Sequence, residues 1–157
     1  MLKETNHSSI NVRTANVDDI DNVVRFNCDM AFETERMVLD QKKLVLGVSA
    51  VLVDSDLGFY LIAEVERNVI GQLMITKEWS DWRNSMFWWI QSVFVKLEYR
   101  RIGVYTALHA KVLEMAKEET NVCGVRLYVE RENIVAKQTY SHLGMAHSNY
   151  DMFEVGL

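Results

Sequence analysis

One segment constrains the fold more than any other. Residues Met86 to Val95 form a run that is apolar on both of its alternating faces, apart from Gln91 and Ser92. Successive side chains of a strand point to opposite faces of the sheet, so a strand with one wet face alternates apolar and polar residues. A run without that alternation indicates a central strand that is covered on both sides. The chain is therefore expected to form a layered structure around this strand.

The spacing of apolar residues predicts the other elements. Alternation is typical of strands, and spacing of three or four residues is typical of helices. Asn16 and Asp40 are residue types that cap the start of a helix. The order is one strand, two helices, three strands, a helix, a strand, a helix and a final strand, which predicts an α/β (α+β) fold with helices on both faces of a mixed sheet. Besides the central strand and the two capped helices, strands are expected at Ile10 to Arg13, Phe59 to Val65, Val69 to Thr76, Val122 to Val129 and Tyr150 to Val155, and helices at Val104 to Glu118 and Asn133 to Leu143.

Length and charge limit the class of protein. The chain has 157 residues, which predicts a single domain over residues 1–157. Its 22 acidic and 17 basic residues give a net charge of −5. That balance argues against nucleic acid as the main partner and mildly favours a cationic substrate.

Cysteine spacing and hydropathy bear on where the protein works. Cys28 and Cys123 fit neither a zinc site nor a disulfide framework, which predicts two reduced thiols. Residues Met1 to His7 contain no apolar core for export. The most apolar stretch, Val45 to Val53, is too short to span a bilayer. We therefore expect a soluble, cytoplasmic protein with no membrane partner.

The segment after the central strand has features that suit phosphate. Residues Arg100 to Tyr105 lead from that strand into a helix, whose N-terminus carries unpaired N–H groups and a partial positive charge. Gly103 allows a ligand to approach the backbone, and Arg100 and Arg101 add cationic donors. Taken alone, the motif fits a helix start with solvated arginines equally well. Its position beyond the carboxyl end of a buried strand favours a ligand site.

Two motifs together resemble the GNAT superfamily of N-acetyltransferases. The family's loop is Gln/Arg-x-x-Gly-x-Gly/Ala, and the sequence here is Arg100-Arg101-Ile102-Gly103-Val104-Tyr105. The order of elements from Ile10 to Val155 also matches. The resemblance implies a mixed, mostly antiparallel sheet of about six to seven strands, splayed where coenzyme A binds. The family's second motif is an Asn that opens a short helix, followed by Ala, Tyr and Gly, and it matches Asn133, Ala136, Tyr140, Gly144 and Met145.

The resemblance also implies an activity. An N-acetyltransferase of this type moves the acetyl group of acetyl-CoA to a primary amine of a small molecule or peptide, by direct attack in a ternary complex. The central strand's backbone and Asn133 would bind the pantetheine arm, the loop N–H groups would bind the pyrophosphate, and Tyr140 would protonate the departing thiolate. The implied coenzyme A-binding residues are Val93, Phe94, Val95, Arg100, Arg101, Ile102, Gly103, Val104, Tyr105, Asn133 and Ala136.

The chain departs from the family's pattern at two positions. Tyr105 stands where the family prefers Gly or Ala, and Leu97 stands where many members have proline. Tyr105 has helical spacing to Leu108 and Val112, which favours a core position that leaves its backbone N–H available to phosphate. The alternative is a displaced or weakened cofactor site.

The residues on the acceptor side are less well defined by the sequence. Family members often use a carboxylate on the fourth strand as the base, but here that strand offers Gln91, which can hold a water and cannot accept the proton itself. Glu33, Asp81 and Trp82 lie in segments that usually line the acceptor side, and for each a solvated or loop-packing role is the alternative. The four histidines are dispersed, so no metal is expected.

Two other functions remain open at this stage. A non-catalytic module of the same fold could bind acyl-CoA as a sensor or regulator. A small α/β interaction protein could use the arginine loop without binding a nucleotide. Turnover separates the enzyme from the sensor, and cofactor binding separates both from the interaction protein. The family and the aromatic segment Trp79 to Trp82 would also allow a homodimer, although core or loop packing is the preferred interpretation of these tryptophans.

Overall fold

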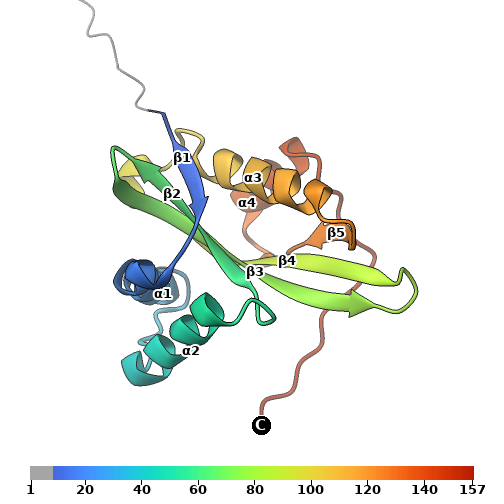
Figure 1. Cartoon of the computed structure of the whole chain (residues 1–157), viewed down its shortest axis with the longest axis horizontal. Helices are drawn as coiled ribbons and strands as arrows, with labels where there is room; N and C mark the ends of the chain where they lie inside the picture. Colours follow the sequence, from blue (N-terminus) through green and yellow to red (C-terminus); the bar gives the residue numbers. More distant parts are fainter. Residues whose placement is uncertain (1–8) are drawn as a thin grey trace, which may run out of the picture. The chain divides into compact units, whose positions relative to one another are not determined.

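The computed structural model describes residues 9–157, which divide into two compact units (Figure 1). The first unit, Met1–Leu127, is described from residue 9 onward and contains the whole sheet. The second unit is Tyr128–Leu157. The interpretation of Met1 to His7 lies outside the described residues.

The first unit contains a five-stranded sheet in the order β1-β2-β3-β4-β5. Neighbouring strands from β1 to β4 are antiparallel, and β5 runs parallel to β4. The sheet is therefore mixed and mostly antiparallel, as the resemblance implies. The strands are β1 (Asn11–Thr14), β2 (Phe59–Val65), β3 (Asn68–Ser80), β4 (Ser85–Val95) and β5 (Val122–Arg126).

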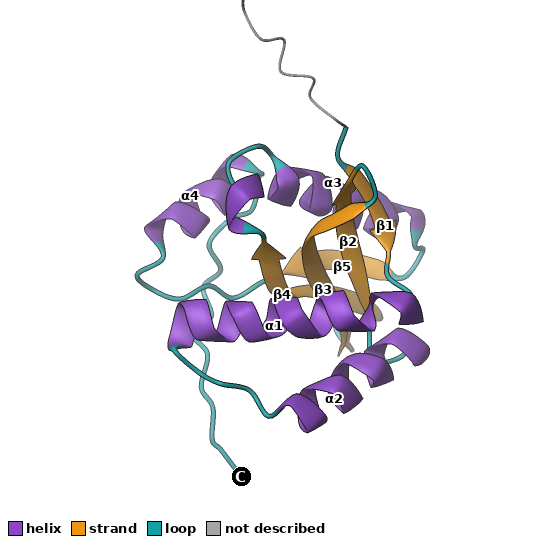
Figure 2. Ribbon diagram, turned by 90° about the vertical axis from the view of Figure 1, so that its left-hand side faces the viewer, coloured by secondary structure: helices purple, strands orange, loops and turns teal. Residues whose placement is uncertain are grey.

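Helices cover both faces of this sheet (Figure 2). Helices α1 (Ile20–Glu35) and α2 (Gln41–Val53) lie on one face, and α3 (Val104–Glu118) lies on the other. Short 3-10 turns precede α1 at Val17–Asp19 and follow β4 at Leu97–Tyr99. Asp40 caps α2 through hydrogen bonds from the backbone N–H groups of Lys42 and Lys43, as predicted.

The hydrophobic core has two parts, which explains the unbroken apolar pattern of β4. Trp88 and Ile90 belong to the larger cluster, together with Leu108 and Val112 of α3. On the opposite face, Phe94 packs against Phe26 of α1, with ring centroids 5.0 Å apart. Strand β4 is thus covered on both sides, which confirms the expectation of a central strand.

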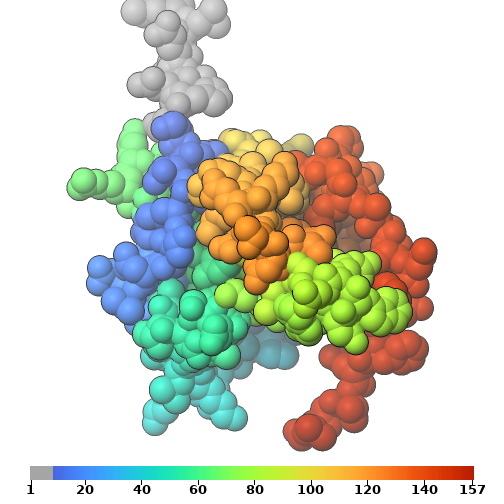
Figure 3. Space-filling model, turned by 45° about the vertical axis from the view of Figure 1, so that its right-hand side comes forward, coloured from blue at the N-terminus to red at the C-terminus, as the bar shows by residue number. Residues whose placement is uncertain are grey.

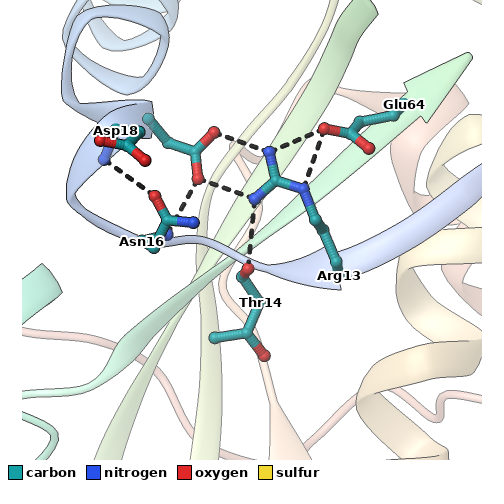
Figure 4. A network of polar contacts seen from close by, with 6 residues as sticks. Arg13, Thr14, Asn16, Asp18 and Glu64 are labelled. Atoms are coloured by element: carbon teal, nitrogen blue, oxygen red, sulfur yellow. Dashed lines mark hydrogen bonds and ion pairs between the residues drawn. The ribbon is translucent and has the colours of Figure 1, made fainter. Parts of the chain in front are cut away.

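A polar network centred on Arg13 fastens the start of α1 to the sheet (Figure 4). The Arg13 guanidinium donates to both carboxylate oxygens of Asp19 at 2.8 Å and to Glu64 on β2 at 2.7 and 2.9 Å. Asn16 and Asp19 form a reciprocal capping box, which confirms Asn16 as a cap. The hydrogen bonds from Arg13 hold the pKa of the Asp19 carboxyl below its ordinary value, and Asp19 is 4% exposed.

The structure corrects the expected strand count from about six to seven down to five. Residues 150–155 form no regular strand, and the side chains of Tyr150, Phe153 and Val155 are exposed. Alternation marks a segment that could have one buried face, but a strand also needs a neighbour for its backbone groups. β5 also ends at Arg126, earlier than the expected end at Val129.

The hairpin between β3 and β4 is longer than predicted. β3 continues through Ser80, so the turn is only Asp81 to Asn84, where a longer polar connection was expected. The tip is exposed at the surface, where it is yellow-green in Figure 3.

The second unit contains one helix, α4 (Ile134–His142). Asn133 caps it by accepting a hydrogen bond from the Ala136 N–H at 3.1 Å. Gly144 follows in a left-handed conformation with φ 87°, a typical helix stop. Both boundaries agree with the sequence pattern. Among residues 9–157 no helix combines the length and the apolar character needed to cross a bilayer.

Candidate acyl-coenzyme A site

The connection from β4 to α3 forms a compact loop at the carboxyl end of the central strand. Arg101 and Gly103 both adopt left-handed backbone conformations, with φ 65° and 89°. Gly103 is the N-cap of α3 and supplies no side-chain hydrogen bond to the helix start. The first turn of α3 therefore presents N–H groups and the positive end of the helix dipole without a side-chain cap, an arrangement suited to phosphate oxygens.

Arg100 braces this loop against α1. Its Nε donates to the Val95 carbonyl at 2.8 Å, and its two terminal nitrogens donate to the Glu33 carboxylate at 2.5 and 2.7 Å. These hydrogen bonds lower the pKa of Glu33 and raise that of Arg100. Two residues that the sequence assigned separately, Arg100 to the cofactor and Glu33 to the acceptor side, are therefore a single ion pair. A direct phosphate contact by Arg100 remains a prediction.

Close packing fixes where α3 begins. A Cβ at Gly71 on β3 would lie 3.0 Å from the Phe94 carbonyl oxygen and 3.1 Å from a methyl group of Val104. The absence of a side chain at Gly71 thus allows the first residue of α3 to approach the sheet. Val104 itself is 2% exposed. Arg101 and Ile102 are exposed in the loop.

Tyr105 uses its unusual side chain as a core residue. The ring packs against the larger hydrophobic cluster, with its centroid 5.9 Å from that of His109. The bulk at the family's Gly/Ala position is therefore directed into the protein. His109 is buried, and this desolvation lowers its pKa, so the imidazole next to Tyr105 is held neutral.

The end of β4 extends beyond its parallel partner. Pairing with β5 covers only Met86 to Trp89, whereas β4 continues to Val95. Val93, Phe94 and Val95 all lie in this extension, with β3 on one side. The strand edge that faces away from β3 can accept an extended ligand by adding hydrogen bonds along the backbone. Pairing stops because β5 itself ends at Arg126, and the splay of strands that the resemblance implies remains a prediction.

A buried polar cluster under this part of β4 was missed by sequence reasoning. Gln72 of β3 is fully buried and donates from Nε2 to Asn27 Oδ1 at 3.0 Å and to the Ser92 carbonyl at 3.2 Å. The signal in the sequence was a single amide in an otherwise apolar run from Val69 to Ile75.

The acceptor-side candidates do not gather at one place. Gln91 donates from Nε2 to Thr76 Oγ1 at 2.5 Å, and Glu33 lies at the loop. Asp81 and Trp82 are in the hairpin turn, and Trp82 is 86% exposed. Because a strand rises about 3.3 Å per residue, the turn is roughly 20 Å along β4 from Gln91.

Sequence reasoning also missed a carboxylate on β3. Glu78 of β3 accepts from Trp89 Nε1 at 2.6 Å and from Arg126 at 3.2 Å. The Arg126 guanidinium in turn lies 3.5 Å from the centroid of the Phe87 ring. Trp89 thus faces a polar group, while Trp88 is in the core.

The residues of the second motif lie in the second unit. Asn133 and Ala136 form the cap of α4, as described above. Tyr140 is partly buried on the same helix, and desolvation raises the pKa of its phenol. The described residues contain no group of three or more His, Cys, Asp or Glu side chains arranged to bind a metal ion.

Comparison with known proteins agrees with this geometry. The family model "Acetyltransferase (GNAT) family" matches residues 20–145. The chain therefore belongs to the GNAT acetyltransferase family, which places it among the acyltransferases.

Individual relatives are similar over different parts of the chain. A crystal structure of a possible acetyltransferase from Clostridium difficile 630 is 44% identical with a TM-score of 0.88, covering 94% of this chain and 97% of that one. A predicted acetyltransferase from Clostridium acetobutylicum, solved with acetyl-CoA, has a TM-score of 0.75 at 18% identity, covering 94% and 96%, and supports the fold alone. Streptothricin acetyltransferase A from Bacillus subtilis (strain 168) is 35% identical over 77 residues, which are 49% of this chain and 41% of that protein. The chain thus matches less than half the length of this curated relative.

Proposed function

We propose that the chain transfers an acetyl group from acetyl-CoA to a primary amine of a small molecule or peptide, by direct attack in a ternary complex. The observation that carries the proposal is the start of α3, which has no side-chain cap, beside the part of β4 that extends beyond β5. The helix start suits a diphosphate and the strand edge suits an amide-containing arm. We take residues 1–157 as one acetyltransferase domain of a cytoplasmic protein.

The groups present fit the chemistry of coenzyme A. The N–H groups at the start of α3, from Val104 onward, would hold the pyrophosphate, and the left-handed Arg101 and Gly103 lie in the loop that leads into this helix end. The backbone of Val93 to Val95 would hold the pantetheine arm, with Asn133 as a further contact. When bound, acetyl-CoA supplies an activated acyl group as a thioester.

Proton movement at this site can be assigned to the chain's own groups. The amine nitrogen forms a bond to the carbonyl carbon, the carbon–sulfur bond breaks, and the thiolate takes a proton that we assign to Tyr140. The Tyr140 phenol is protonated at neutral pH, as a proton donor requires, and burial raises its pKa above the ordinary value. Glu33 is a poor base near neutral pH, because its hydrogen bonds with Arg100 lower its pKa. A water held by Gln91 is the base we propose.

The acceptor is proposed only as a class. A primary amine is cationic when free, and the chain's net charge of −5 favours the approach of cations. Streptothricin is the first acceptor to test, because the matched part of the curated relative belongs to a streptothricin acetyltransferase. Aliphatic diamines and a lysine-containing peptide complete a panel that separates small from peptide acceptors.

Two measurements test the proposal in sequence. Acetyl-CoA at 100 times its Kd would stabilise the folded protein by about 2.7 kcal/mol, which raises Tm by roughly 5–10 °C. Release of free thiol with each amine then measures turnover. No thermal shift at millimolar acetyl-CoA would contradict coenzyme A binding altogether. Binding without thiol release across the panel would instead favour a non-catalytic acyl-CoA sensor.

A further inference from the structure

The buried cluster beneath β4 connects α1, β3 and β4 through one side chain, Gln72. Gln72 Nε2 uses its two hydrogens on Asn27 of α1 and on the Ser92 carbonyl of β4. A hydrogen bond also joins Asn27 to the phenol of Tyr60 on β2. Asn27 of α1 thus holds the Gln72 amide in place, and the same amide donates a hydrogen bond to the backbone of β4.

The point of β4 that Gln72 holds is a bulge. Gln72 pairs with Phe94 and Met74 pairs with Gln91, so Ser92 and Val93 together face one residue of β3. Ser92 has φ 49°, a left-handed conformation that is unfavourable for a residue other than glycine. An inserted residue of this kind redirects the backbone locally, and such bulges are common next to active sites.

Gln72 leaves a buried acceptor unused to make these contacts. Within residues 9–157, its Oε1 is buried and accepts no hydrogen bond. The reversed amide orientation would set Oε1 against two other oxygens, so the acceptors at Asn27 and Ser92 fix the amide. Buried polar atoms without a partner are rare in folded proteins. We therefore attribute the position of this side chain to the two hydrogen bonds that it donates, one of which goes to the bulge.

The hydrogen bond to the Ser92 carbonyl also determines where the Val93 N–H points, because both groups belong to one peptide. The described peptides are all trans and planar, so the C=O of Ser92 and the N–H of Val93 point in opposite directions. Because Gln72 holds the Ser92 oxygen on its own side, the Val93 N–H points away from the cluster. Val93 lies in the extension of β4 beyond β5.

We propose that Gln72 is a positioning residue that aims the Val93 N–H at the thioester carbonyl oxygen of bound acetyl-CoA. The inference rests on the proposed function. As the amine attacks, negative charge develops on that oxygen, and a donor held in place beforehand stabilises it without reorganisation. A bulge with a movable peptide would still bind the cofactor through its other contacts, but the transition state would lose this donor.

The test compares Gln72→Met, which has similar volume and no donors, with a control elsewhere. Removing one oxyanion donor lowers kcat by about 10²–10³-fold in enzymes that use one. We expect Gln72→Met to lower kcat by about 10²-fold with little change in KM for acetyl-CoA. Asp19→Asn also loses buried hydrogen bonds, in the Arg13 network on β1 and β2, and is expected to keep its kcat while losing stability.

A second variant and a spectroscopic signal keep the test decisive if Gln72→Met fails to fold. Asn27→Ser removes one of the two anchors of Gln72, and we expect a loss in kcat of about tenfold. In the unmodified protein, the amide resonance of Val93 should shift further with acetyl-CoA than with S-ethyl-CoA, which has the same pantetheine arm but no thioester carbonyl.

Each outcome decides a different claim. If the unmodified protein shows no turnover, the proposed function fails. If it turns over but Gln72→Met and Asp19→Asn behave alike in kcat, or the Val93 amide responds equally to both ligands, the role of Gln72 is overturned while the proposed function stands.

Discussion

Arg100 shows how one side chain can hold the shape of a loop. Its guanidinium spans the Val95 carbonyl and the Glu33 carboxylate. Lysine keeps the charge but cannot reproduce this planar set of donors. We therefore expect Arg100→Lys to weaken acetyl-CoA binding about tenfold, measured by calorimetry, as loop geometry is lost. Arg101→Lys is the matched control and should retain affinity. Full affinity in Arg100→Lys would show that charge alone matters.

Tyr140 is the residue on which the proposed chemistry depends most directly. A phenol is protonated at neutral pH, so the proton is available to the thiolate. We expect Tyr140→Phe to lower kcat by about 10²–10⁴-fold, with acetyl-CoA affinity retained. Stopped thiol-release assays at saturating amine measure this. An unchanged kcat would remove Tyr140 from the mechanism.

Asp19 contributes to the stability of the fold. The direction in which this contribution changes with pH follows from the pKa of its carboxyl. Hydrogen bonds from Arg13 lower the folded-state pKa below the ordinary 3.8. The stabilisation is complete above that ordinary value and is lost as pH falls through the lowered folded-state pKa. Asp19→Asn should reduce the free energy of unfolding by roughly 1–3 kcal/mol at neutral pH. Urea titrations at about pH 7 and pH 2 should show the difference shrinking in acid; a constant difference would contradict the ion-pair account.

At the scale of elements, the approach of α3 to β3 is set by one glycine. A methyl group at Gly71 meets the Phe94 carbonyl and Val104 at 3.0 and 3.1 Å, so Gly71→Ala must push the start of α3 outward. We expect acetyl-CoA affinity to fall by about tenfold or more, because the proposed phosphate site moves with the helix. Gly47→Ala in α2 is the control: no atom lies within 4 Å of its Cβ, and the change should stabilise the protein by roughly 0.5–1 kcal/mol.

The elements also show what sequence patterns can and cannot establish. Periodicity and capping residues located every helix and the five strands, because those signals are local. The expected strand at Tyr150 to Val155 failed because pairing depends on a partner that no local pattern contains. The ion pair between Arg100 and Glu33 joins residues 67 positions apart, and the contact from Gln72 to Asn27 spans 45. Such pairings exist only once the sheet and α1 are assembled.

For the whole molecule, the absence of proline has a kinetic consequence. Slow refolding phases of about 10–100 s usually reflect proline isomerisation, and this chain has no proline. We expect refolding from denaturant to lack such a phase and to be insensitive to a prolyl isomerase. Stopped-flow fluorescence can follow this through the four tryptophans. A slow phase that the isomerase accelerates would contradict the expectation.

The extension of β4 beyond β5 has a final consequence for how the protein must be handled. An edge that can receive the amide-rich arm of a cofactor can equally receive the backbone of another polypeptide, because both present the same donors and acceptors. Ligand binding would then act as a shield against self-association as well as a step in catalysis. Purified protein stored at high concentration should keep best with coenzyme A present.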